Sequence, residues 1–245
     1  MSEAAAKAPA TEKQPLSVEE LMTNYLYYKT FKCPVCNKDF MDILLRRSKL
    51  RSIGVDRDFR TRYHDIDPNL YEVTVCGHCG YAALHNYFDK ILSKQGEWIL
   101  EKITPNYRHV DHDIPFTPAS ALARYKQALA CAQAMEAKSS TKAVICLKMA
   151  WLYRDAKDEK GELTLIRLSY TALKDAFSNE NFPLGSMDEP TTMYMIAEMA
   201  RRLGEFDEAL KMIGNVITSR ATPVSIKNKA QDMKELIKDK NRGLS

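Results

Sequence analysis

Two Cys-x-x-Cys pairs are the residues of this sequence whose types and spacing best fit a chemical role. CPVC occupies residues 33–36 and CGHC occupies residues 76–79. Each pair can present two thiolates from one tight turn, and two such turns facing each other form the tetrahedral sulfur cage that zinc prefers. Iron also accepts four thiolates and is the alternative metal. The predicted ligands are Cys33, Cys36, Cys76 and Cys79.

The residues that follow each pair support this prediction. In such a knuckle the residue after the second cysteine takes a positive φ, which glycine adopts freely and asparagine at little cost. The sequence has Asn37 and Gly80 at these positions. Four protein ligands leave no open position for water, which is typical of a structural metal site. A redox role would need a βαβ pattern beside one pair, and the sequence shows none.

A basic segment, residues 46–62, lies between the two pairs. Its only acids are Asp56 and Asp58. The candidate phosphate contacts in it are Arg46, Arg47, Lys49, Arg51, Arg57, Arg60 and Arg62. A cationic loop between zinc knuckles can contact the phosphates of DNA or RNA. The other interpretation is a charged face that pairs with acids in the C-terminal half of the chain.

The segment HVDHD contains further metal-ligand types, namely His109, Asp111, His112 and Asp113. A metallohydrolase would need additional ligands from separate elements, and a polar connector is the other interpretation. No nucleophile motif, phosphate-binding glycine loop or dinucleotide fingerprint is present elsewhere. A metal-dependent hydrolase centred on residues 109–113 is one of three functional hypotheses.

The elements that must position the cysteines are short. Residues 1–16 have no apolar periodicity and are predicted to form a disordered tail. Ser17 and Glu20 form a capping-box pattern that begins a short helix. Residues 30–80 are rich in aromatic and β-branched types, and the alternation in residues 71–75 predicts a strand that leads into the second cysteine pair.

After the second pair the strand signals stop. Apolar spacings of three and four residues predict two connecting helices, at residues 81–92 and 97–103. With them, residues 17–116 are predicted to form a zinc-ribbon-like module with flanking helices. A loop rich in proline then separates this module from the helical domain, residues 117–245.

The helical domain shows the signs of a repeat. Thr117 and Thr222, each followed by proline, predict helix starts with threonine as the N-cap. Small and aromatic residues in 192–216 have the spacing of a tetratricopeptide repeat, and residues 143–172 contain a second copy. The predicted fold is α+β, mainly α: a small zinc-ribbon-like β module followed by a tetratricopeptide-like helical array.

The segments CPVC, SKLR, DRDFRTRYHDIDPNLYEV, VCGHCGYAA and AWLYR resemble those of bacterial zinc-ribbon proteins catalogued as domain of unknown function 2225. The resemblance covers nearly the whole chain after residue 25. It implies a Cys-x-x-Cys zinc module joined to tetratricopeptide-like helices, and it implies no activity. It supports the four cysteines as metal positions and gives no support to residues 109–113.

Composition excludes some classes of protein. The 245 residues are 45% hydrophobic and 28% charged, which is ordinary for a globular protein. No apolar run reaches the roughly 18–20 residues that span a bilayer. The N-terminal residues lack the apolar block of a secretion signal, so we expect a cytoplasmic protein with reduced cysteines. A net charge of +4 does not by itself indicate a nucleic-acid partner.

The first functional hypothesis is therefore a non-enzymatic interaction protein, in which a structural zinc module supports a helical array that holds a protein or peptide segment in its groove. The second is nucleic-acid binding through residues 46–62. The third is the hydrolase at residues 109–113.

Overall fold

The structure is a computed structural model that describes residues 16–241. The predicted tail, residues 1–16, lies outside the described residues apart from its last position. The capping box is confirmed: the Glu20 amide donates to Ser17 Oγ at 3.2 Å, and the Ser17 amide donates to Glu20 Oε2 at 2.8 Å. Helix α1 (Val18–Asn24) begins there.

Six strands in the described part of the chain form three antiparallel hairpins. Their bounds are β1 (Leu26–Lys32) with β2 (Asp39–Leu45), β3 (Ser52–Val55) with β4 (Thr61–Tyr63), and β5 (Val73–Val75) with β6 (Ala82–Leu84). The first and third hairpins each carry one cysteine pair in the turn. The second hairpin contains part of the basic segment.

The predicted helix at residues 81–92 is wrong. Strand β6 begins two residues after Gly80, and a 3₁₀ turn follows it. The Cys76 amide donates to the Tyr81 carbonyl at 2.8 Å, so the chain returns antiparallel to β5 directly after the second cysteine pair. A short apolar run fits a buried strand and a helix equally well, and the pairing with β5 decides between them.

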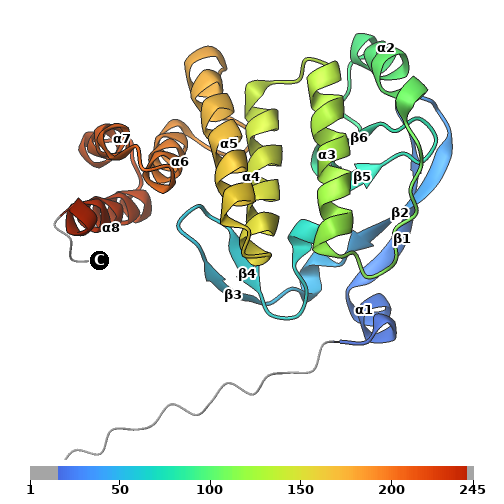
Figure 1. Cartoon of the computed structure of the whole chain (residues 1–245), viewed down its shortest axis with the longest axis horizontal. Coiled ribbons are helices and arrows are strands. Elements are labelled where there is room, and N and C mark those ends of the chain that lie inside the picture. The colour runs from blue at the N-terminus through green and yellow to red at the C-terminus, as the bar shows by residue number, and fades with distance from the viewer. Residues whose placement is uncertain (1–15, 242–245) are drawn as a thin grey trace, which may run out of the picture.

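The rest of the chain is helical, and the predicted fold class, α+β and mainly α, is confirmed. The bounds are α2 (Ser93–Lys102), α3 (Pro118–Ala134), α4 (Ser139–Asp155), α5 (Glu159–Asn179), α6 (Glu189–Arg202), α7 (Phe206–Thr218) and α8 (Val224–Asn241). From α3 onwards each helix packs against the next in sequence, and α6 also contacts α8. Figure 1 shows α3, α4 and α5 side by side, with α6, α7 and α8 at the end away from β1 and β2. This order suits a repeat array, and the tetratricopeptide assignment stays a prediction.

The two predicted helix starts differ. Thr117 is an N-cap, because its Oγ1 accepts a hydrogen bond from the Ser120 amide at 3.1 Å. The prediction for Thr222 is wrong: the Pro223 carbonyl accepts the first helical hydrogen bond, from the Lys227 amide at 3.0 Å, so proline holds the cap position. Thr222 is buried instead, and its hydroxyl has no hydrogen-bond partner within the described residues.

One cluster of buried residues joins the cysteine module to the helices. It extends from Cys33 through Tyr81 and Tyr125 to Ile237. In α6 every residue from 192 to 200 is buried, because α5, α7 and α8 all pack against this helix. None of the helices in residues 16–241 is long and apolar enough to cross a membrane.

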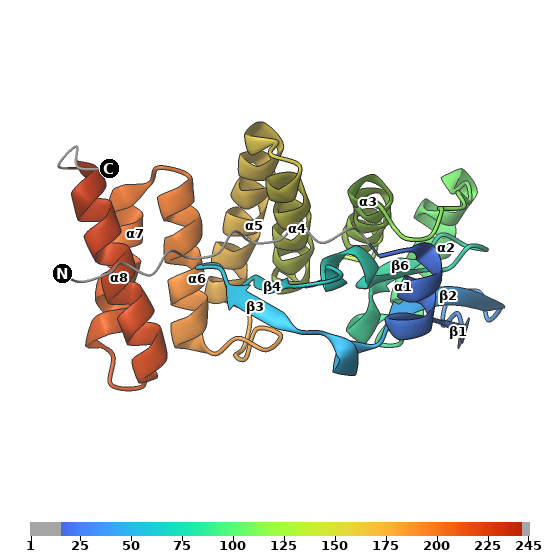
Figure 2. The same cartoon turned by 90° about the horizontal axis from the view of Figure 1, so that it is seen from below.

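The β3–β4 hairpin lies across the helices. Figure 2 shows it running from the other strands past α4 and α5 toward α6. At its tip the Phe59 ring packs on Tyr194 of α6 with ring centroids 5.3 Å apart. Phe59 has φ of 59°, a conformation that is uncommon for a bulky residue. The hairpin therefore covers part of α4 and part of α6.

Candidate metal centre and the basic hairpin

Two equivalent turns hold the four cysteines. The Cys33 amide donates to the Lys38 carbonyl at 3.0 Å, and the Cys76 amide donates to the Tyr81 carbonyl at 2.8 Å. Each pair thus closes its own hairpin, β1–β2 in one case and β5–β6 in the other. Because the backbone is held in the same way in both turns, both turns present their thiols alike.

The residues after the second cysteines adopt the predicted conformation. The φ angle is 58° at Asn37 and 78° at Gly80. Their amides donate to the carbonyls of Cys33 and Cys76 at 2.9 and 3.0 Å. Gly80 meets a second requirement, since a Cβ there would lie 2.4 Å from Cγ of Tyr107. Only glycine satisfies both the backbone angle and the close approach of that ring.

The four sulfur atoms are spaced for one metal ion. Cys33 Sγ lies 3.6 Å from Cys79 Sγ, Cys36 Sγ lies 3.7 Å from Cys76 Sγ, and all four lie within 4.8 Å of one another. A tetrahedral zinc ion with Zn–S bonds of about 2.3 Å would separate its sulfurs by about 3.8 Å. The donor set therefore fits a four-thiolate metal site.

The centre is closed. Cys33, Cys76 and Cys79 are buried, and Cys36 is half-buried. Thr104 Oγ1 donates to the Cys79 carbonyl at 2.9 Å, so the segment after α2 packs over the second turn. Four protein sulfurs complete a tetrahedron and leave no coordination position for a substrate. This arrangement can hold a metal and stabilise two hairpins against each other.

The His109–Asp113 cluster, residues 109–113, does not assemble a metal site. His109 Nε2 is hydrogen-bonded to Asp111 Oδ1 at 2.9 Å, and its Nδ1 lies 3.3 Å from the Tyr107 hydroxyl. In residues 16–241 the four cysteines are the only group of three or more His, Cys, Asp or Glu side chains close enough to hold an ion. The hydrolase hypothesis therefore has no metal centre at these residues.

The family model described as "uncharacterized protein conserved in bacteria" (DUF2225) matches residues 26–237. The chain belongs to this family. The match includes both cysteine pairs and almost the whole helical domain, and it confirms the resemblance seen in the sequence motifs. No curated protein and no solved structure matches the chain. DUF2225 membership assigns no reaction, so the side chains around the metal centre and the hairpin are the guide to function.

Two arginines of this DUF2225 protein's basic segment are engaged in ion pairs. Arg60 Nη1 donates to Asp155 Oδ1 at 2.8 Å and Nη2 donates to Asp67 Oδ2 at 2.7 Å. Arg62 donates to Asp155 and to Asp56, both at 2.9 Å. Arg60 is only 3% exposed and cannot contact a phosphate at the surface, which corrects its place among the candidate contacts.

The acids of the segment also contact α4. Asp58 Oδ2 accepts a hydrogen bond from Trp151 Nε1 at 2.9 Å, and Asp58 Oδ1 accepts one from Arg154 at 3.3 Å. Asp56 accepts from the same arginine at 3.1 Å. Burial opposes ionisation of Asp58, but the hydrogen bond and charge of Arg154 outweigh it and lower the pKa of Asp58 below its ordinary value of 3.8. Hydrogen-bonded charges therefore hold the hairpin on the helices.

The remaining cations of the segment are at the surface. Arg47 pairs with Glu72. Within the described residues no carboxylate forms an ion pair with Arg46, Lys49, Arg51 or Arg57.

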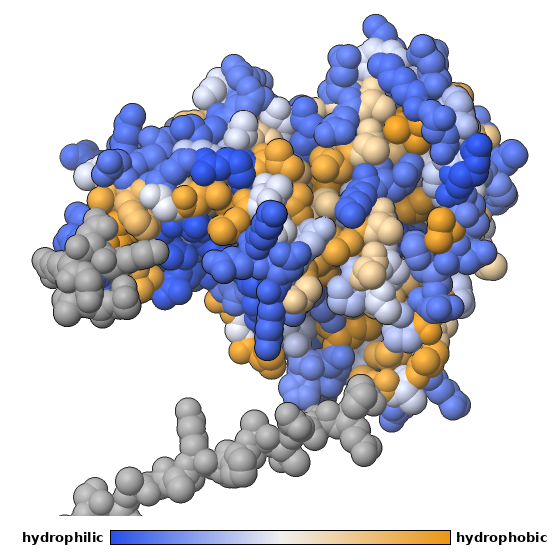
Figure 3. All heavy atoms as spheres, viewed as in Figure 1, coloured by the Kyte–Doolittle hydropathy of each residue, from blue (hydrophilic) through white to orange (hydrophobic). Residues whose placement is uncertain are grey.

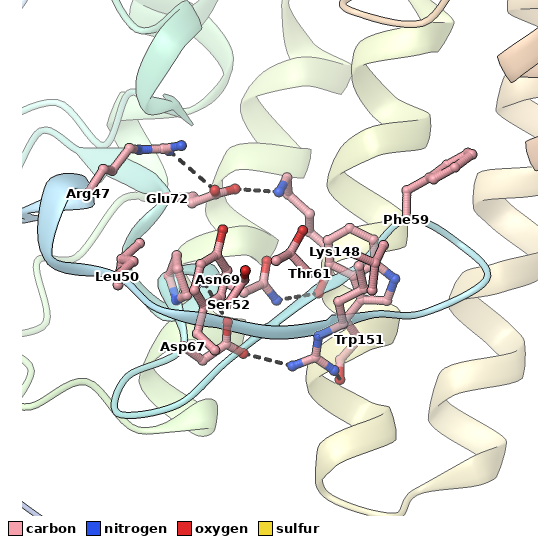
Figure 4. Close-up of a pocket in the computed structure, with 14 residues that line it drawn as sticks. Arg47, Leu50, Ser52, Phe59, Thr61, Asp67, Asn69, Glu72, Lys148 and Trp151 are labelled. Carbon is pink, nitrogen blue, oxygen red and sulfur yellow. Dashed lines mark hydrogen bonds and ion pairs between the residues drawn. The ribbon is translucent and has the colours of Figure 1, made fainter. Parts of the chain in front are cut away.

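A groove beside the docked hairpin was not predicted from the sequence. Its first part, of about 560 Å³, lies between the hairpin and α4. In Figure 4, Glu72 lies between Arg47 and Lys148 and is joined to both, while Trp151 lies farther along α4. A second part, of about 420 Å³, shares these four residues and continues to α6 and the loop at residues 184–187. Three of the four were singled out in the sequence, each in a different segment: Arg47 in the basic segment, Glu72 in DRDFRTRYHDIDPNLYEV and Trp151 in AWLYR.

Proposed function

We propose that this protein is a non-enzymatic, zinc-stabilised interaction module whose groove holds a segment of a partner protein. The observation that carries the proposal is the floor of the second part of the groove. It is lined by Leu84, Val144, Leu147, Leu184, Met187 and Met195. Concave apolar sites with a few polar groups at the rim are typical of ligand and peptide binding, and methionine side chains adapt to different partners.

The metal centre supports a structural role in this proposal. Four thiolates at tetrahedral spacing favour zinc over the harder metals. A module with this little core gains folding free energy on the order of 10 kcal/mol from such an ion. Because the ligands fill every position, the proposal gives the metal no catalytic step. The six free cysteines suit the reducing cytoplasm in which we place the protein.

The groove can be tested by blocking it. Ser186 is exposed and lines the second part, so Ser186→Arg would fill the groove without disturbing the core. Ser178, on α5, is also exposed and lies outside the groove, so Ser178→Arg is the matched control. The tagged protein should co-purify a reproducible partner from its own cells, and Ser186→Arg should lose this partner while Ser178→Arg keeps it. Equal recovery with both variants would contradict the proposal.

Nucleic-acid binding is a second candidate, favoured by the exposed cations that have no ion-pair partner: Arg46, Lys49, Arg51 and Arg57. Phosphate contacts would make binding strongly dependent on salt. We would measure binding to DNA and RNA oligonucleotides across ionic strength, with Lys49→Ala and Arg51→Ala as weakened variants. The absence of binding at low salt would remove this candidate.

A further inference from the structure

The groove joins two parts of different character. The part nearest α6 has the apolar floor, with Leu147, Met187 and Met195 among its lining residues. The part nearest the root of the β3–β4 hairpin contains the charged group that Figure 4 shows, in which Glu72 lies between Arg47 and Lys148. An occupant that fits both parts must therefore combine apolar side chains with charge.

The charged group holds two cations and one carboxylate. Arg47 Nη2 lies 3.3 Å from Glu72 Oε1, and Lys148 Nζ contacts the other oxygen of the same carboxylate. The Arg47 side chain is 63% exposed, whereas those of Glu72 and Lys148 are 19% and 17% exposed. An ion pair this exposed on one side contributes little to stability, so Arg47 can turn to a second carboxylate at small cost.

Other exposed cations lie along the basic segment, from the root of the hairpin to its tip. Arg46, Lys49, Arg51 and Arg57 are exposed and have no ion-pair partner in the described chain. The nearby acids are already committed to arginines, because Asp56, Asp58, Asp67 and Asp155 all pair with Arg60, Arg62 or Arg154. Hydrophilic and hydrophobic residues are interleaved over the face shown in Figure 3. Charge therefore distinguishes the open side of the hairpin.

We infer that the occupant of the groove is an acidic protein segment, with a carboxylate received by Arg47 and apolar side chains seated on the floor between α4 and α6. This inference rests on the proposed function and specifies the partner's chemistry. The positive potential along the hairpin attracts the segment, and the apolar floor retains it. Lys148 remains paired with Glu72 and completes the positive end of the groove.

The test uses the full-length, metal-loaded protein and short fluorescent peptides of repeating Leu-Xaa-Ser-Xaa, in which Xaa is Glu, Gln or Lys. At low salt the Glu peptide should bind at least about fivefold more tightly than the Gln peptide, and the Lys peptide least tightly. Arg47→Glu should abolish or reverse this order. Arg51→Glu changes the net charge equally but lies outside the groove, so it should keep most of the preference. Metal content and thermal unfolding of each variant confirm that it is folded.

Several outcomes would overturn the inference. Equal affinity for the three peptides, with loss of all binding in Ser186→Arg, would leave the groove as a site and remove its preference for acids. If Arg47→Glu and Arg51→Glu weaken the preference for the Glu peptide equally, the preference comes from the overall positive charge of the hairpin and not from a contact with Arg47. An oligonucleotide that binds more tightly than the Glu peptide and depends on Arg51 would assign the cations to nucleic acid. Absence of binding by any peptide would also reject the inference, while the partner test with Ser186→Arg judges the proposed function separately.

Discussion

Arg60 and Asp155 form a two-point ion pair between residues 95 positions apart in the sequence. Both terminal nitrogens of the arginine donate to the carboxylate, one of them at 2.8 Å. The arginine belongs to the hairpin between the two cysteine pairs, and the aspartate ends α4. Because the Arg60 side chain is 4% exposed, this contact fixes the hairpin on the helices and removes one cation from the surface.

Arg60→Ala should lower the free energy of unfolding by about 2–3 kcal/mol, because it removes the hydrogen bonds of a buried guanidinium to Asp155, Asp67 and the Trp151 carbonyl, while Arg62 still pairs with Asp155. Arg60 serves two carboxylates, Asp155 and Asp67, so Arg60→Lys should recover only part of the loss. Urea unfolding followed by circular dichroism measures the change. Arg51→Ala, at an exposed position with no ion pair, is the control and should stay within about 0.5 kcal/mol of wild type. Equal effects of the two alanine substitutions would contradict the docking role of Arg60.

Gly80→Ala should destabilise the protein more than Gly204→Ala. Both glycines have positive φ, 78° and 79°, so each substitution carries a backbone cost of about 1–2 kcal/mol. A Cβ at Gly204 would meet nothing within 4 Å, whereas one at Gly80 would clash with Tyr107, which adds about 1–3 kcal/mol. A double-mutant cycle with Tyr107→Ala measures this added term. Equal destabilisation by Gly80→Ala and Gly204→Ala would contradict the close contact between the Tyr107 ring and Gly80.

Acid should weaken the docking of the hairpin. The folded-state pKa of Asp58 lies below 3.8, so above about pH 4 its ionised form contributes stability, and this contribution is lost as pH falls through the folded pKa. Asp58→Asn should therefore be less stable at neutral pH and should lose less stability than wild type between about pH 5 and 3. Unfolding free energies at each pH, with metal content determined in parallel, separate this effect from metal loss. Asp89→Asn, at an exposed position, should follow the wild-type curve. The prediction is wrong if the free energy of unfolding falls by the same amount in Asp58→Asn and in wild type as the pH is lowered.

Metal analysis should find one zinc ion per chain. Cys76→Ser removes a ligand that the other cysteines surround, so this variant should lose the ion and expose the β hairpins to proteolysis. Cys146→Ala is the control, because Cys146 is buried in α4 away from the four-cysteine cluster. Its metal content should equal that of wild type. Iron in place of zinc would correct the metal, and stoichiometric metal in Cys76→Ser would reject the ligand set.

Local rules predicted the parts of the structure whose causes lie within a few residues. Asn37 and Gly80 indicated the knuckle turns because the positive φ is a property of single residues. Ser17 and Thr117 indicated helix starts because the capping hydrogen bonds span three residues. The cluster of four cysteines was predictable from spacing, since two Cys-x-x-Cys turns can offer a tetrahedral set of ligands without other partners.

Features that depend on distant partners were missed. Strand β6 exists because β5 lies beside it, and its apolar residues alone suggested a helix. The sequence left open that the basic segment pairs with acids of the C-terminal half, but it did not indicate that Arg60 would be buried against Asp155, 95 positions away. The groove combines Arg47, Glu72 and Lys148 from three elements, and no local pattern marks such a combination.

The groove is the central claim, and site-specific photo-crosslinking in the native cell tests it most directly. A photoreactive amino acid placed at Ser186 lines the groove, and one placed at Ser178 does not. The account predicts a reproducible protein adduct from position 186 that position 178 does not form. The same adducts from both positions, or adducts from position 178 alone, would contradict it.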